Sequence, residues 1–221
     1  MSKAAKSSPT PLLSAEEQAV AESIETLYDV FSVYPLAQKV EGCPCCVSSE
    51  DEAALHVRPL RRLTGDDLSR YLFKALTTWG DANDFRHFLP RLLELAAETR
   101  NYDVDLDAIT SKLEYAEWQQ WPEREQQTVR LYLSALWRFV LTLPPEEVLL
   151  GEYLEAISQA EEDLTPYLKL WQNTATDAAF TQLAIFFDSQ LDLHRGKLTN
   201  WSGRREQMTQ VIDWLAEMGL A

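Results

Sequence analysis

The sequence has few positive charges, few glycines and few cysteines for its 221 residues. Its 20 lysines and arginines are outnumbered by 35 aspartates and glutamates, so the formal net charge at pH 7 is −15. Attraction to phosphate backbones and anionic lipids needs an excess of lysine and arginine, so we expect neither nucleic acid nor a membrane surface as a partner. With only seven glycines and no convincing alternation of apolar and polar residues, β-structure is not expected.

Long hydrophobic runs are also missing, and none approaches the roughly 20 residues that a membrane-spanning helix needs. The first ten residues are rich in serine, lysine and alanine and lack the apolar centre of a secretory signal. An odd number of cysteines crowded into one loop is not a disulfide framework. We therefore expect a cytoplasmic protein with a flexible tail over residues 1–13 and a single helical domain over residues 14–221, which could subdivide near residues 100–105.

Helical periodicity is what the sequence has in abundance, and it predicts an all-α fold. Capping boxes open helices at Ser14, Ser49 and Thr64, Gly80 is expected to end the third helix, and Pro145 suits the first turn of a later one. About nine helices are predicted, near residues 14–34, 49–56, 64–79, 84–99, 106–118, 122–143, 145–162, 176–194 and 202–219. Their lengths suit antiparallel pairs, arranged either as an irregular HEAT-like solenoid or as a helical bundle.

All three cysteines lie in the segment Glu41-Gly-Cys-Pro-Cys-Cys-Val47. The C-x-x-C spacing of Cys43 and Cys46 is typical of two thiolates on one zinc ion, with His56 as a third ligand and an acid or His87 as a fourth. Cys45 fits that site less well, because adjacent side chains point apart in extended backbone. The same spacing allows redox chemistry, although no strand precedes it, and the cysteines could equally be packed in a tight loop.

A second candidate site follows the predicted helix over residues 84–99. Asp84, His87 and Arg91 fall on one face of this helix, opposite an apolar face. A histidine flanked by an acid and a guanidinium can exchange protons near neutral pH, and Pro90 leaves a backbone carbonyl free one turn earlier. In the simpler interpretation, Asp84 caps the helix, the charges form exposed pairs and the proline makes a kink.

Seven acids and no lysine or arginine occupy residues 146–163. This block could dock a basic protein partner, or it could be a solvated helix face that keeps the protein soluble. Its acids are Glu146, Glu147, Glu152, Glu155, Glu161, Glu162 and Asp163.

The segments E-G-C-P-C-C-V, L-H-V-R-P-L, D-D-L-S-R-Y and T-T-W-G-D-A-N-D-F-R-H-F-L-P-R-L-L-E-L, between Glu41 and Leu95, resemble a family of uncharacterised bacterial helical proteins. The resemblance implies a cytoplasmic helical protein in which the cysteine loop and the segment from Trp79 to Glu94 act together. It implies no reaction, cofactor or partner.

From these features we expect a non-catalytic, protein-binding adaptor, or an inhibitor resembling an immunity protein, that uses its acidic surface on a basic partner. The alternative is a metal-dependent or histidine-dependent enzyme. It would use the cysteine loop together with Asp84, His87 and Arg91.

Overall fold

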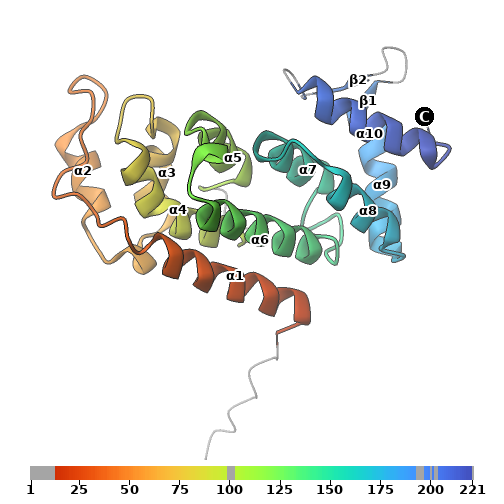
Figure 1. The fold of residues 1–221 in the computed structure, drawn as a ribbon, viewed down its shortest axis with the longest axis horizontal. Coiled ribbons are helices and arrows are strands. Elements are labelled where there is room, and N and C mark those ends of the chain that lie inside the picture. Colours follow the sequence, from red (N-terminus) through yellow and green to blue (C-terminus); the bar gives the residue numbers. More distant parts are fainter. Residues whose placement is uncertain (1–12, 99–102, 193–196, 200, 202–203, 221) are drawn as a thin grey trace, which may run out of the picture.

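The computed structural model describes residues 13–98, 103–192, 197–199, 201 and 204–220. The fold is all-α, as predicted, and the described residues form ten α-helices where nine were expected (Figure 1). The helices are α1 (Ala15–Phe31), α2 (Ser49–Leu55), α3 (Gly65–Lys74), α4 (Ala82–Ala96), α5 (Leu106–Tyr115), α6 (Glu123–Val140), α7 (Leu150–Ala160), α8 (Thr165–Asn173), α9 (Asp177–Gln190) and α10 (Arg205–Glu217). Two 3₁₀-helices, η1 (Leu60–Arg62) and η2 (Trp118–Gln120), and the strands β1 (Leu191–Asp192) and β2 (Lys197–Leu198) complete the described elements.

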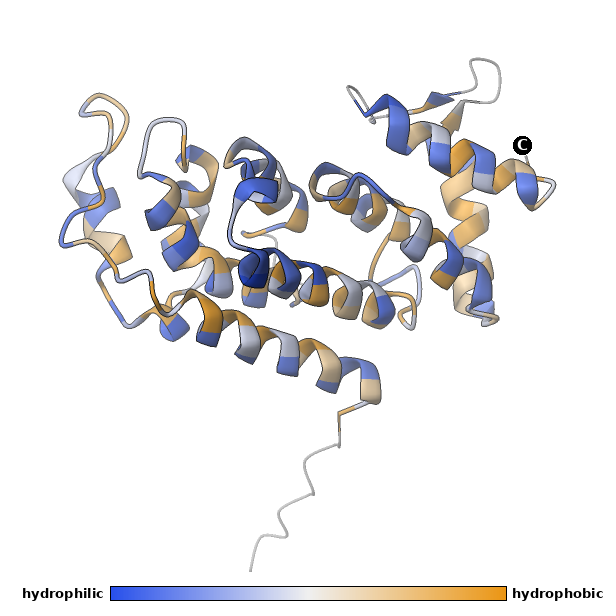
Figure 2. Cartoon of the chain, in the orientation of Figure 1, coloured by the Kyte–Doolittle hydropathy of each residue, from blue (hydrophilic) through white to orange (hydrophobic). Residues whose placement is uncertain are grey.

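Helix α1 packs along α6 and α4, although both are distant from it in the sequence (Figure 1). Hydrophobic and hydrophilic residues alternate turn by turn along α1, as expected for a helix with one buried face (Figure 2). Solenoid repeats contact only their neighbours in the chain, so this long-range packing resembles a bundle more than a solenoid.

A cluster of aromatic and charged side chains holds the end of α1 against α4 and α6. The carboxylate of Glu125, only 5% exposed, accepts a hydrogen bond from the Tyr34 hydroxyl at 2.6 Å and pairs with Arg86 at 3.3 Å. The Arg86 guanidinium also lies 4.3 Å from the centre of the Trp121 ring. The Tyr34 hydroxyl satisfies one oxygen of this carboxylate, whereas the other faces Arg86 Nε without hydrogen-bond geometry, so its desolvation is compensated only in part. The cluster joins the three helices at one point.

Two helix starts differ from the prediction by one or a few residues. The cap of α2 is Ser48, whose hydroxyl accepts from the Asp51 amide, and not Ser49. The cap of α4 is Asp81, and Asp84 closes the same capping box from the third helical position. Asp84 therefore belongs to the first turn of α4, and its carboxylate accepts a hydrogen bond from the Asp81 amide.

Helix α3 ends at Lys74, five residues before the predicted end. The Lys74 carbonyl accepts the amides of Thr77, Thr78 and Trp79, and Leu76 takes a left-handed φ of 66°. The chain turns away here because the Trp79 ring is buried beside the loop that carries the cysteines. Gly80 does have a positive φ, of 72°, but it connects this turn to α4 and does not cap α3.

The prediction assigned a helix start to the wrong proline. Residues around Pro145 form a turn, and α7 begins only at Leu150, whose amide donates to the buried side chain of Gln182 from α9. The proline that does occupy the first turn of a helix is Pro166 in α8, a helix that was not predicted. The Leu164 amide before it donates to Gln210 of α10 at 2.7 Å. Both starts are thus stabilised by side chains distant in sequence.

The buried side chains form one continuous core cluster from Val20 to Leu215. Helix α5 packs on both α4 and α7, so contacts cross the region near residues 100–105. The division of the chain into one domain or two stays a prediction. The tail over residues 1–12 and the expected helix start at Ser202 lie outside the described residues.

Candidate functional sites

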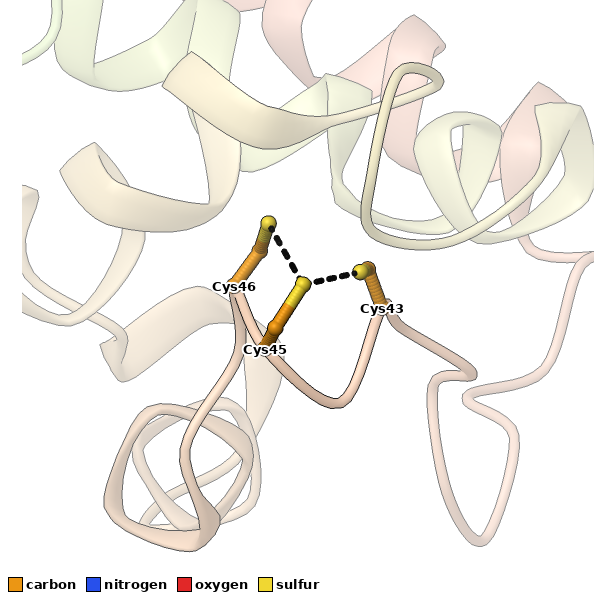
Figure 3. A group of neighbouring side chains, drawn as sticks. All are labelled: Cys43, Cys45 and Cys46. Carbon is orange, nitrogen blue, oxygen red and sulfur yellow. Dashed lines mark hydrogen bonds between the residues drawn. The ribbon is translucent and has the colours of Figure 1, made fainter.

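The three cysteine side chains converge on one side of a tight turn between α1 and α2 (Figure 3). The Cys43 carbonyl accepts the amides of Cys46 at 2.9 Å and Val47 at 3.0 Å, which closes the turn. The Sγ atoms of Cys43 and Cys45 are 3.0 Å apart, those of Cys45 and Cys46 are 3.7 Å apart, and all three lie within 4.8 Å of one another. These three thiols, which we call the thiol turn, could hold a metal ion.

The thiol turn is fixed to the segment between α3 and α4. The Cys43 amide donates to the Thr78 carbonyl at 2.8 Å, and Gly42 forms an antiparallel β-bridge with Trp79. The Lys74 ammonium group donates to the Cys46 carbonyl. A Cβ atom on Gly42 would lie 2.8 Å from the side chain of Val47, so this position excludes larger residues. The turn therefore has a defined place on the folded helices.

The Glu52 carboxylate of α2 connects both sides of this arrangement. It accepts the Val40 amide at 2.8 Å and the Trp79 indole N–H at 3.2 Å, and it contacts His56 Nε2 at 2.9 Å. Trp79 is 2% exposed, so its indole N–H depends on this carboxylate. Glu52 thus acts as a clamp between the start of the thiol turn and the segment that follows α3.

The structure brings Cys45, and not His56, close to the two predicted cysteines. Cys45 was expected to point away from Cys46, but the backbone here is turned and not extended, so Cys45 joins Cys43 and Cys46. Among the described residues, no other histidine, cysteine or carboxylate joins this group, and His56 lies against Glu52. The pKa of Cys43 is lowered, first by its hydrogen bonds from Cys45 and then by those from Cys46. The pKa of Cys45 is raised to about 11, first by its hydrogen bond with Cys43 and then by that with Cys46. Cys43 therefore has more thiolate character than Cys45.

The side chains of the second predicted site are held by different partners. His87 Nδ1 lies 2.8 Å from the Tyr34 carbonyl, while Arg91 donates to the Leu63 carbonyl at 2.7 Å and pairs with Glu94. Burial lowers the pKa of His87, which favours the neutral ring. His87 borders an open cleft of about 620 Å³, but neither Asp84 nor Arg91 is among the residues that line it.

The acidic block divides into two parts. Four of its acids line a cleft of about 750 Å³, together with three acids that the sequence interpretation missed. We call this the acidic cleft, and its carboxylates are those of Glu98, Asp105, Asp107, Glu146, Glu147, Glu152 and Glu155. The other three members of the block do not line it: Glu161 pairs with Arg130 at 3.4 Å, Asp163 accepts the Thr165 amide at 2.9 Å, and Glu162 is exposed.

The packing of α5 against α7 builds the acidic cleft. Its apolar surface comes from Ala96, Val104, Leu106, Val148, Leu149, Tyr153 and Ala156. Desolvation raises the pKa of Asp107, and the nearby Asp105 adds to the shift. Desolvation also raises the pKa of Glu155. Arg204, which pairs with Glu155 at 3.1 Å, opposes this shift, while Asp107 and Glu152 add smaller increases. The carboxylates of this cleft therefore disfavour one another's charge.

Asp105 could have been found from the sequence as the N-terminal cap of α5, a position that an aspartate often occupies. No sequence signal places it, or Glu98 and Asp107, opposite Glu152 and Glu155.

The chain matches no family model, no curated protein and no solved structure. None of the described helices combines the length and the apolar character needed to cross a membrane.

Proposed function

We propose that this chain is a non-catalytic binding protein that holds a basic segment of a partner protein in the acidic cleft. The observation that supports it is the composition of the cleft wall: among the described residues that line it, there are seven carboxylates and no lysine or arginine. Such a wall concentrates negative potential and attracts a cationic segment.

The apolar surface within the cleft favours a protein partner over a simple cation. Leu149 is 39% exposed there although it is a large hydrophobic residue, and Tyr153 and Val148 lie beside it. A peptide that presents apolar side chains inward and lysine or arginine at its edges would cover both kinds of surface. In this proposal the protein works in the bacterial cytoplasm, as an adaptor or as an inhibitor of a basic protein.

The raised pKa values of Asp107 and Glu155 support a binding role. Carboxylates that are partly desolvated beside other carboxylates carry an electrostatic cost in the free protein. A bound cationic group would relieve that cost, so it would bind more favourably here than at an isolated surface acid.

The test uses a labelled amphipathic peptide of leucine and lysine as the probe. The variant Glu146→Lys/Glu147→Lys/Glu152→Lys reverses three acids of the cleft without touching the Glu155–Arg204 pair. We expect association to slow about tenfold or more, and the remaining binding to lose its salt dependence.

The matched control reverses three exposed acids outside the cleft, Glu114, Glu162 and Glu217, and so changes the net charge equally. Circular dichroism verifies that both variants are folded. If the control slows association as much as the cleft variant, or if neither does, the acidic cleft is not the docking surface.

A second candidate function, zinc binding, is supported by the thiol turn. Three thiols within 4.8 Å of one another are donors of the type that Zn²⁺ prefers. Since Asp84, His87 and Arg91 are held by separate partners, this candidate includes the metal centre but not a histidine-dependent reaction. Titration of the reduced chain with Co²⁺ tests this candidate.

A further inference from the structure

We infer that Cys43, Cys45 and Cys46 together bind one soft metal ion through three thiolates, and that the fourth coordination position stays open to a ligand from solution. The inference rests on the metal-binding part of the proposed function. It differs from the sequence prediction in two ways, because Cys45 becomes a ligand and His56 does not.

The sulfur positions support three thiolate ligands. Two thiolates on a tetrahedral zinc ion lie about 3.8 Å apart when each Zn–S bond is about 2.3 Å. The Sγ atoms of Cys45 and Cys46 are already 3.7 Å apart, whereas those of Cys43 and Cys45 are 3.0 Å apart and would have to separate, and all three lie within 4.8 Å of one another. Small side-chain rotations would place all three around one ion, since the turn already directs them to one side (Figure 3).

The surroundings leave the fourth position without a protein ligand in the described part of the chain. His56 Nε2 contacts Glu52, and the Glu52 oxygens are in turn engaged by Val40 and Trp79. Structural zinc sites have four protein ligands, whereas a site with three retains a water or another exchangeable ligand. The thiol turn belongs to the second kind.

The site is also accessible. Cys45 is exposed and its two neighbours are partly exposed, so a small donor molecule can reach a bound ion. On binding, three S–H bonds break, three metal–sulfur bonds form and three protons pass to the solvent. Thiolate donors select thiophilic ions, principally Zn²⁺ and Cu⁺. The site would therefore exchange its ion and its fourth ligand.

The test titrates the reduced full-length chain with Co²⁺, whose visible absorption reports the number of thiolates and the geometry. Cys45→Ser should lower the affinity at least about 100-fold, while His56→Asn should change it less than about threefold. Adding imidazole or a monothiol to the Co²⁺-loaded protein should shift the absorption bands. Competition with Zn²⁺ and with Cu⁺ then identifies which ion the site prefers.

Different failures have different meanings. If neither Co²⁺ nor Zn²⁺ nor Cu⁺ binds to the intact, folded chain, the metal-binding part of the proposed function is wrong. If the ion binds but His56→Asn abolishes binding and Cys45→Ser does not, metal binding stands and the three-thiolate assignment is overturned. If added imidazole or monothiol leaves the absorption bands unchanged, the open fourth position is overturned. Cys45→Ala serves as a second variant if the serine is tolerated poorly.

Discussion

The thiol turn and the acidic cleft are assembled in opposite ways. The thiol turn takes its three donors from residues 43–46, and backbone hydrogen bonds within the turn direct them. The acidic cleft collects its carboxylates from residues 98–107 and 146–155, which only the packing of α5 on α7 brings together. A site of the first kind can be read from the sequence, whereas a site of the second kind depends on the fold.

The supports of the two sites differ as well. A chain of aromatic contacts lies under the thiol turn: Phe88 is 4.6 Å from Tyr71, and Tyr71 is 5.4 Å from Trp79, measured between ring centres. The acidic cleft instead depends on the spacing of two helices. Changes in the aromatic chain should therefore affect the thiol turn first.

The largest expected effect is that of Phe88→Ala. Phe88 is fully buried on α4, and removal of its ring leaves a cavity in the core below the thiol turn. We expect the free energy of unfolding to fall by about 3–5 kcal/mol, measured by urea denaturation followed by circular dichroism.

Phe73 is the matched control, because it is a phenylalanine on α3 that is 80% exposed. Phe73→Ala should change the free energy of unfolding by no more than about 0.5 kcal/mol. A loss below about 1 kcal/mol for Phe88→Ala would show that this face of α4 does not support the N-terminal core.

A smaller effect is expected from Glu52→Gln. The carboxylate holds the Val40 amide, the Trp79 indole and His56, and an amide can accept fewer of these bonds. We expect a loss of about 1–3 kcal/mol in the free energy of unfolding, with faster hydrogen exchange at the Val40 amide. Glu50→Gln, on the same helix and fully exposed, should leave that exchange rate unchanged. Equal exchange in both variants would mean that Glu52 is not a clamp.

The smallest effects concern pH, and the two regions should respond with opposite sign. Burial lowers the pKa of His87, so below pH 6.5 the unfolded chain takes up a proton before the folded one, and stability falls on acidification. Desolvation raises the pKa of Asp107, so above pH 3.8 the unfolded chain loses its proton first, and stability falls as the pH rises.

Two variants that cannot titrate separate these contributions. His87→Asn should lessen the loss of stability between pH 6.5 and pH 5. Asp107→Asn should raise the free energy of unfolding at pH 7 by less than about 1 kcal/mol, since the group is partly solvated, and should have no effect at pH 3. Urea denaturation at these pH values is the measurement. If His87→Asn loses as much stability between pH 6.5 and pH 5 as the unsubstituted chain, or if the effect of Asp107→Asn is the same at pH 3 and pH 7, the contrast is refuted.

The helices could be predicted where their signals are local. The capping boxes at Ser14 and Thr64 and the buried face of α4 are encoded within a few turns of sequence, and the structure confirms them. The starts of α7 and α8 could not be predicted, because Gln182 and Gln210 stabilise them from distant helices. The strands β1 and β2 have two residues each, too few for an alternating pattern.

The same distinction applies to the candidate sites. The sequence identifies the cysteine loop, but not that Cys45 lies beside Cys43 and Cys46, since the direction of Cys45 depends on a turn closed by the Cys43 carbonyl. One wall of the acidic cleft was recognised as a run of like charges. The other wall has no such run, because a mixed stretch that includes Arg100 and Asn101 separates Glu98 from Asp105 and Asp107, and the fold then places these acids along one cleft.

The packing of α1 has a consequence for synthesis on the ribosome. Its apolar residues, such as Ile24 and Leu27, are buried against α4 and α6, and α6 ends only at Val140. At roughly 5–20 residues per second, the ribosome needs about 5–20 s to make the intervening chain. During that time α1 can contact α4 once that helix has been made, but the part of its hydrophobic stripe that α6 covers has no partner. The nascent chain therefore offers chaperones a defined apolar segment throughout that interval.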